Sequence, residues 1–161
     1  MSLRHAVDVG APILVVLGLT IGLSGQSNDG WMGTWKVNVA KSTYSPGPPP
    51  KSATHKWEPS GSGGFKHSID TVDDQGQSTH SEVVAKFDGK DYAVQGGQAK
   101  TTRAYKRIDD RMFEATGKAD GKATVTIREA LAADGKTKTA TISGKNAQGQ
   151  TVNNAIVFEK Q

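Results

Sequence analysis

The sequence contains no cysteine among its 161 residues. This absence excludes disulfide bonds, a thiol nucleophile and thiolate metal sites, and it excludes a lipid attached to a cysteine after an N-terminal leader. Aromatic residues are also scarce, at 6% of the chain, and hydrophobic residues make up 35%, whereas there are 19 glycines. A small supply of bulky apolar residues and a large supply of turn formers favour short strands over long helices.

The charged residues form no long run of one sign. The formal net charge is +4, but lysines and arginines are scattered and alternate with aspartates and glutamates. We interpret them as a solvated surface, with an anion-binding face as the alternative. No basic run is interleaved with aromatic residues, so we expect no nucleic-acid partner.

Only one sustained apolar run is present, from Ala11 to Leu23. It follows Arg4 and ends in small residues, which is the pattern of a secretory signal, so we predict a signal peptide over residues 1–25 and one mature domain over 26–161. The run has 13 residues, fewer than the roughly 20 that a spanning helix needs, and we expect no membrane span after its removal. Export to the periplasm or the medium follows from this prediction.

An uncleaved membrane anchor is the alternative interpretation of the leader. Asp8 is unusual in the region before the apolar run, and no Ala-x-Ala cleavage site is present. Cleavage is expected around Ser24 to Ser27.

Turn signals divide the remaining chain into about ten short segments. Asp88-Gly89, Asp120-Gly121 and Asp134-Gly135 each predict a tight hairpin, because Asp-Gly supplies the positive φ angles of such turns. Strands are expected near 33–39, 53–58, 64–72, 77–87, 90–95, 101–108, 111–118, 122–132, 136–143 and 151–159. The tract Ser45–Pro50 carries four prolines and predicts a stiff loop between the first two strands.

The predicted fold class is all-β, an antiparallel meander closed into a small barrel of about 8–10 strands. No amphipathic helix is predicted that could cover a sheet face, so an uncovered meander removes its edges by closing on itself. A sandwich of two sheets is the alternative.

The residues Gly33-Thr34-Trp35-Lys36-Val37 open the first predicted strand. Here the sequence resembles the calycin barrels, namely the lipocalins, with Gly-x-Trp, and the intracellular fatty-acid-binding proteins, with Gly-Thr-Trp-Lys. The opening through Pro50, together with Thr151–Asn154, is also similar to a group of small exported bacterial proteins. The resemblance implies a lipocalin-like barrel in which Gly33 and Trp35 are structural. Physically, Gly33 permits a tight approach to the strand and Trp35 can plug the closed end.

The sequence departs from these families where they bind ligands. Fatty-acid-binding proteins hold a ligand carboxylate with an Arg-x-Tyr pair in the last strand, and Ile156 and Phe158 occupy those positions here. They also insert a pair of helices after the first strand, where this chain has the proline loop. The ligand chemistry of either family therefore does not transfer.

Strand alternation places two histidines on one face. If Trp57 pairs with Phe65, then His55 lies opposite His67 on the apolar, inward face, which His67 shares with Ile69. The two imidazoles could line a cavity, bind a metal ion or haem, or form a structural or solvent-facing pair. His80 falls on the opposite face and supplies no third ligand, so we predict no metal site and no cofactor.

A second group shares one face of the sixth predicted strand: Arg103, Tyr105 and Arg107. If these side chains point inward they form a wall that holds an anion, and if outward the arginines are solvated. Later strands contribute residues that we interpret as core or cavity lining: Val125, Ile127, Ala140 and Ile142.

The sequence shows no catalytic motif. It has no Gly-x-Ser-x-Gly, no phosphate-binding glycine loop and no His-Glu-x-x-His. Asp73-Asp74 and Asp109-Asp110 are interpreted as turn residues. We therefore expect a protein without enzymatic activity.

The sequence predicts a monomeric carrier of a small hydrophobic or amphipathic ligand. The predicted lining residues are His55, Trp57, Phe65, His67, Ile69, Phe87, Arg103 and Tyr105. The alternatives are a structural or envelope interaction protein with a filled barrel, and an enzyme of unknown chemistry.

Overall fold

The computed structural model describes residues 30–96, 100–146 and 148–161. In chain order, its elements are β1 (Gly33–Val37), the 3-10 helix η1 (Val39–Lys41), β2 (Ser52–Ser60), β3 (Gly64–Val72), β4 (Ser78–Ala85), β5 (Asp88–Ala93), β6 (Thr101–Asp109), β7 (Met112–Ala119), β8 (Lys122–Leu131), β9 (Thr137–Lys145) and β10 (Thr151–Lys160). The prediction of an all-β meander of short strands is confirmed. The predicted leader lies outside the described residues. Within them, no helix is long and apolar enough to cross a membrane.

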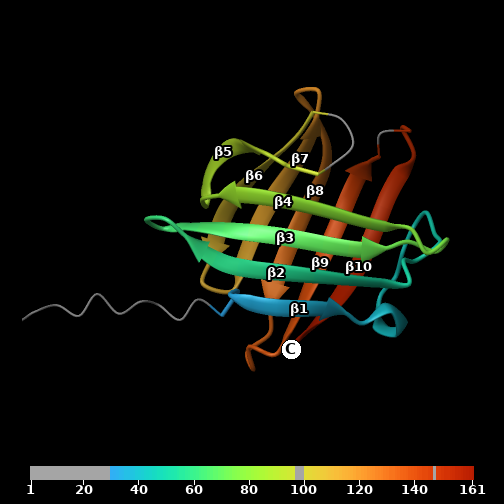
Figure 1. The fold of residues 1–161 in the computed structure, drawn as a ribbon, viewed down its shortest axis with the longest axis horizontal. Helices are drawn as coiled ribbons and strands as arrows, with labels where there is room; N and C mark the ends of the chain where they lie inside the picture. The colour runs from blue at the N-terminus through green and yellow to red at the C-terminus, as the bar shows by residue number, and fades with distance from the viewer. Residues whose placement is uncertain (1–29, 97–99, 147) are drawn as a thin grey trace, which may run out of the picture.

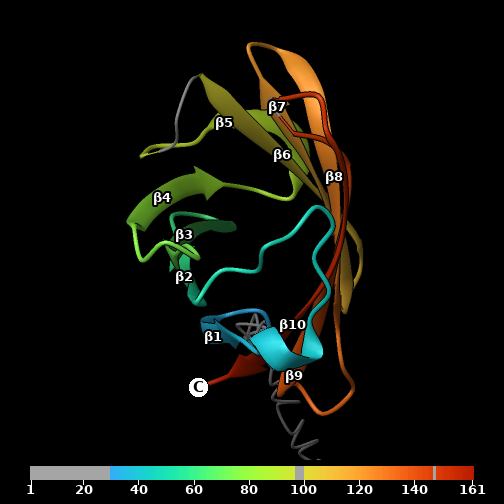
Figure 2. The same cartoon turned by 90° about the vertical axis from the view of Figure 1, so that its right-hand side faces the viewer.

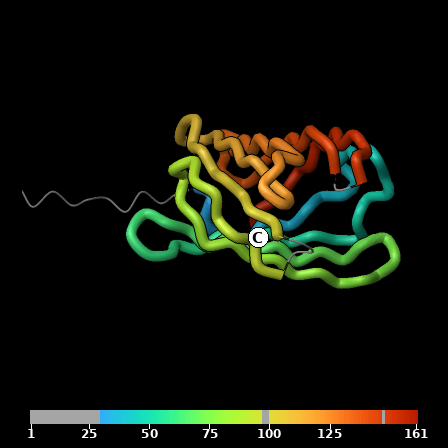
Figure 3. The backbone as a smooth tube through the Cα atoms, turned by 90° about the horizontal axis from the view of Figure 1, so that it is seen from above, coloured from blue at the N-terminus to red at the C-terminus, as the bar shows by residue number. Residues whose placement is uncertain are grey.

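The strands form one ten-stranded antiparallel sheet, in the order β4-β3-β2-β1-β10-β9-β8-β7-β6-β5. Strand β1 pairs with both β2 and β10, which joins the two ends of the meander. Figures 1 and 2 show the sheet curling so that β1–β4 lie across β6–β10. Seen from above in Figure 3, the green strands lie on one side of the interior and the orange and red strands on the other.

The two edge strands, β4 and β5, meet near one end. Glu82 and Gln95 exchange two backbone hydrogen bonds there, at 2.9 and 2.7 Å. The sheet is therefore a nearly closed barrel, the arrangement expected for a meander that has no helix to cover it.

The predicted turns are confirmed in part. Asp120-Gly121 closes the β7–β8 hairpin with positive φ at both residues, 49° and 77°. Asp88-Gly89 does not close a hairpin, because Asp88 begins β5 and the following residues lie in a register shift opposite β6. That prediction is wrong for a physical reason: an irregularity inside a strand uses the same positive φ that a tight turn uses.

The connection between β1 and β2 covers an exposed edge. Strand β1 is shorter than the predicted 33–39, because Asn38 caps helix η1. Beyond the helix, Thr43 and Ala155 exchange two backbone hydrogen bonds, at 2.8 and 3.0 Å. Strand β1 pairs with β10 only over Phe158–Lys160, so this connection satisfies part of the remaining edge of β10.

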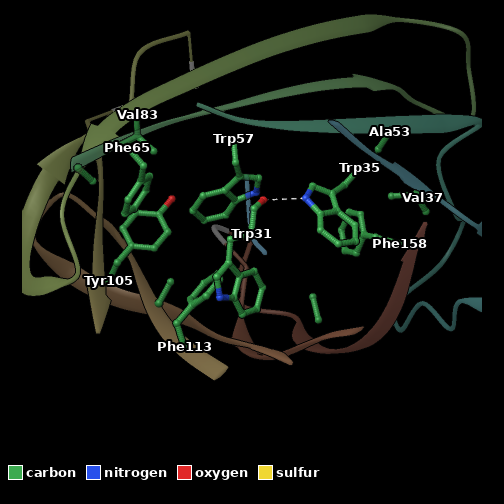
Figure 4. Packing of buried hydrophobic residues seen from close by; sticks show 13 residues of the cluster. Trp31, Trp35, Val37, Ala53, Trp57, Phe65, Val83, Tyr105, Phe113 and Phe158 are labelled. Carbon is green, nitrogen blue, oxygen red and sulfur yellow. Dashed lines mark hydrogen bonds between the residues drawn. The ribbon is translucent and has the colours of Figure 1, made fainter. Parts of the chain in front are cut away.

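Aromatic side chains fill much of the interior. The largest buried ones are Trp31, Trp35, Trp57, Phe65, Tyr105, Phe113 and Phe158. Trp35 has no exposed surface, and its Nε1 donates a hydrogen bond to the Trp31 carbonyl at 2.8 Å (Figure 4). Trp57 packs against Phe65 and Phe113, with ring centroids 4.9 and 5.4 Å apart. This aromatic packing lies beside the site described next.

Candidate functional site

A chain of four polar side chains runs through the interior from β2 to β6. Nδ1 of His55 lies 3.2 Å from Nε2 of His67, and Nδ1 of His67 lies 3.2 Å from the Tyr105 hydroxyl. Nη1 of Arg103 lies 3.5 Å from the same hydroxyl. The sequence-predicted histidine pair and the predicted Arg103–Tyr105 group therefore meet in one network.

The register that brings the histidines together differs from the prediction. Trp57 pairs with His67 rather than with Phe65, and His55 pairs with Ile69. The shift is two residues, because the last pair before the turn is Ser60 with Gly64. A shift of two leaves every side chain on its original face. The imidazoles are diagonal neighbours, with ring centroids 5.0 Å apart, rather than directly opposed.

Both histidines are neutral at neutral pH. Burial lowers the pKa of His55 and of His67 well below the usual 6.5, and the positive charges of Lys138 and Arg103 act in the same direction. His67 is also held by stacking, since its ring lies 4.0 Å from that of Trp57 at an interplanar angle of 18°. In the described part of the chain, no third His, Cys, Asp or Glu joins the pair to form a metal-binding group.

The sixth strand presents its arginine face to the interior. Tyr105 is 1% exposed, and Arg107 lies over the Phe87 ring with its guanidinium carbon 4.3 Å from the centroid. Of the two orientations left open by the sequence, the structure shows the inward one. Ile108, on the other face, is 49% exposed.

The polar network borders a cavity of about 170 Å³. Its lining residues are His55, His67, Ile69, Arg103, Ile127, Glu129, Ala140, Ile142, Ile156 and Phe158. Four isoleucines thus form the apolar wall, while the two histidines, Arg103 and Glu129 supply polar groups.

The other predicted lining residues lie elsewhere. Trp57 and Tyr105 belong to the aromatic packing beside the cavity. Phe65 and Phe87 border a second, more open hollow of about 430 Å³, together with Met32. The eight predicted residues therefore divide between the cavity, the aromatic packing and this hollow.

A buried ion pair was not foreseen from the sequence. Nζ of Lys138 lies 2.6 Å from Oε2 of Glu129, and the two side chains are 0% and 4% exposed. Four aromatic rings surround the ammonium group, with centroids 4.6 to 5.8 Å away: Trp31, Trp35, Trp57 and Phe158. Burial lowers the pKa of Lys138, and the Glu129 carboxylate opposes that shift.

Strand alternation contains the signal for this pair. Lys138 shares its face of β9 with Ala140 and Ile142, and Glu129 shares its face of β8 with Ile127. The sequence places those apolar residues in the interior, so their charged neighbours at two-residue spacing are inward by the same rule. Lys138 and Glu129 were nevertheless not predicted to be buried, because charged side chains are normally expected at the solvated surface.

The geometry defines a class of fold: a small calycin-like barrel with an interior cavity. A solved structure with this fold is the crystal structure of a mutant of the fluorescent protein UnaG, a fatty-acid-binding-protein-like β-barrel. The TM-score is 0.56 at 14% sequence identity, and the match covers 82% of this chain and 96% of that chain. No protein-family model matches the chain, and no curated protein sequence matches it significantly. At this identity, the similarity shows the fold alone.

Proposed function

We propose that this protein binds one small, mainly apolar molecule inside its barrel. The observation that carries the proposal is the cavity of about 170 Å³, in which isoleucine side chains face a few convergent polar groups. Ligand sites in proteins commonly combine a mostly apolar wall with a small number of orienting polar groups. The fatty-acid-binding-protein-like fold supports this function by analogy.

Native mass spectrometry of the protein purified from its source, in its processed form, tests the proposal. The expected result is a mass above that of the processed chain, which returns to the chain mass after denaturing extraction. Identification of the released molecule then gives its chemical class. A chain mass with no adduct, and no thermal stabilisation by a panel of small apolar molecules, would reject the proposal.

One observation favours a second candidate, a structural or interaction protein with a filled barrel. Much of the interior is already occupied by aromatic side chains, from Trp31 to Phe113. In that case the remaining cavity is a packing gap, and the charged exterior contacts a partner. The same mass spectrometry separates the two candidates, because a filled barrel carries no adduct.

We further propose that the protein is exported, acts as a monomer and catalyses no reaction. The apolar run Ala11–Leu23 after Arg4 supports export. Cell fractionation with N-terminal sequencing tests this part: the exported protein should begin near Ser24 to Ser27. Retention of residue 1 in a membrane fraction would instead indicate an uncleaved anchor.

A further inference from the structure

The charges inside the described part of the barrel do not balance at the cavity. Lys138 and Glu129 neutralise each other at 2.6 Å. Arg103 also lines the cavity, but no carboxylate among the described residues lies within ion-pair distance of its guanidinium group. Its one described hydrogen bond runs from Nη1 to the Tyr105 hydroxyl, at 3.5 Å. Its Nε is buried and has no hydrogen-bond partner among the described residues.

The neighbours of Arg103 cannot supply the missing negative charge. The Tyr105 hydroxyl and the His67 ring are neutral groups, linked at 3.2 Å. Burial raises the pKa of Tyr105, so its hydroxyl stays protonated at neutral pH. Arg103 is partly buried, and a guanidinium group withdrawn from water without an anion is costly; pairing with a carboxylate is the usual compensation.

The rest of the cavity selects for a compact apolar body. Ile127, Ile142 and Ile156 form much of the wall. The volume of about 170 Å³ is close to that of a cavity of about 150 Å³ that holds benzene in another protein. Ligand pockets for larger molecules commonly measure about 300 Å³ or more.

We propose that the cavity binds a compact organic anion, of the size of an aromatic or short-chain carboxylate, with its anionic group on Arg103 and its apolar body against the isoleucines. This inference rests on the proposed binding function and specifies its ligand class. Both ring nitrogens of His67 are engaged within the network, so one end of the network, either the Tyr105 hydroxyl or Nε2 of His55, keeps a donor for the anion. The residue that would hold the anion, Arg103, lies on β6. The last strand, β10, offers no such group, because Ile156 and Phe158 are its residues at this point.

Isothermal titration of the full-length protein with three probes tests the inference: benzoate, benzyl alcohol and palmitate. Benzoate and benzyl alcohol have similar size but differ in charge, and palmitate is much longer. We expect benzoate to bind at least about tenfold more tightly than benzyl alcohol, the difference typical of a charged hydrogen-bonded contact. We expect palmitate to bind more weakly than benzoate.

Two variants locate the anion. Arg103→Met should lower benzoate affinity at least about tenfold while leaving benzyl alcohol binding nearly unchanged, which also reports that the barrel is folded. Arg103→Lys keeps a charge and should retain part of the preference for benzoate. The matched control is Arg128→Met, because Arg128 points outward on β8 and pairs with Glu114 at 2.9 Å. It should leave all three affinities unchanged.

The outcomes separate this inference from the proposed function. Equal binding of benzoate and benzyl alcohol, or an unchanged benzoate affinity in Arg103→Met, overturns the anion assignment but leaves a binding barrel. Tighter binding of palmitate overturns the size assignment. Failure of all three probes, together with a protein purified without any adduct, rejects both the inference and the binding function.

Discussion

The least expected residue in this interior is Lys138. A fully buried ammonium group is costly unless it is paired, and here Glu129 and the surrounding aromatic rings share the compensation. The pair lies between the aromatic packing and the cavity, because Glu129 also lines the cavity and Lys138 contacts Trp57 and Phe158. Loss of this ion pair would therefore affect both the aromatic packing and the cavity.

Removing one member of this pair should destabilise the protein strongly. We expect Glu129→Ala to lower the free energy of unfolding by about 3–5 kcal/mol, because it leaves Lys138 buried without its anion. The double variant Lys138→Met, Glu129→Leu should cost less than this single change, since it leaves no unpaired charge. Urea unfolding followed by tryptophan fluorescence measures each value.

An exposed pair serves as the control. Arg128 and Glu114 lie 2.9 Å apart with side chains 58% and 32% exposed. Glu114→Ala should cost at most about 1 kcal/mol, as surface pairs do. Similar losses for Glu114→Ala and Glu129→Ala would show that burial of the interior pair is not what makes it important.

The buried histidines should make stability depend on pH. Because burial lowers the pKa of both His55 and His67 in the folded state, the unfolded chain binds their protons first as the pH falls. The histidine contribution is therefore complete above about pH 6.5, the unfolded pKa, and is lost as the pH falls from there toward the folded values. The steepest slope from two histidines is about 2.7 kcal/mol per pH unit.

Urea unfolding between pH 7.5 and 5 measures this slope. The variant His55→Gln should reduce it by about half, since one of two titrating groups is removed. His80→Gln is the matched control, because His80 is exposed and contacts Asp70 on the outer face, at 2.7 Å. An unchanged slope in His55→Gln would contradict the assignment.

At the scale of the elements, Gly144 links three strands. It lies on β9 opposite Val125 of β8 and Val152 of β10, next to the register shift at Thr124. Its φ is 136°, and a Cβ atom there would lie 2.2 Å from the Thr124 carbonyl oxygen. The irregularity in β8 brings that carbonyl close, so the opposing position accepts only glycine.

Gly144→Ala should therefore destabilise the barrel more than a positive φ alone would. We expect a loss of about 3 kcal/mol or more, combining backbone strain of about 1–3 kcal/mol with the displacement of Thr124. Gly121→Ala isolates the backbone contribution, because Gly121 has a φ of 77° and a Cβ atom added there would meet open space. Equal losses for the two variants, measured by thermal unfolding, would contradict the close approach at Thr124.

The elements themselves were largely predictable, and their pairing was not. All ten predicted strands are present because turn chemistry and alternation are local properties of the sequence. The register of β2 on β3 depends on how many residues the turn after Ser60 uses, and a two-residue error left the inward faces correct. Asp88-Gly89 shows the opposite case, where one local signal fits both a turn and an irregular strand.

The candidate site was predicted only in part for a related reason. His55 and His67 were assigned to the interior because apolar neighbours marked their faces as inward. The orientation of Arg103 stayed open, because its face also carries Arg107 while the opposite face carries Ile108. Lys138 and Glu129 were missed because composition favours solvated charges. The division of the interior into packed aromatics and a cavity depends on side-chain volumes in three dimensions, which alternation does not encode.

At the scale of the whole molecule, filling the cavity from within separates a ligand-binding barrel from a filled one. Ala140 is 2% exposed and lines the cavity between Glu129 and Ile156. A larger side chain at this position would occupy the space from within. In the variant Ala140→Leu, the leucine side chain therefore occupies cavity space that a ligand would otherwise fill.

We expect Ala140→Leu to fold with unchanged or higher stability, by up to about 2 kcal/mol, because up to three added carbons are buried in existing space. If the cavity holds a ligand, the purified variant should lose the mass adduct that the parent protein carries. Ala133→Leu adds the same carbons to an exposed loop position and should keep the adduct. A variant that retains the adduct would place the ligand elsewhere, with the hollow beside Phe87 as the next position to block.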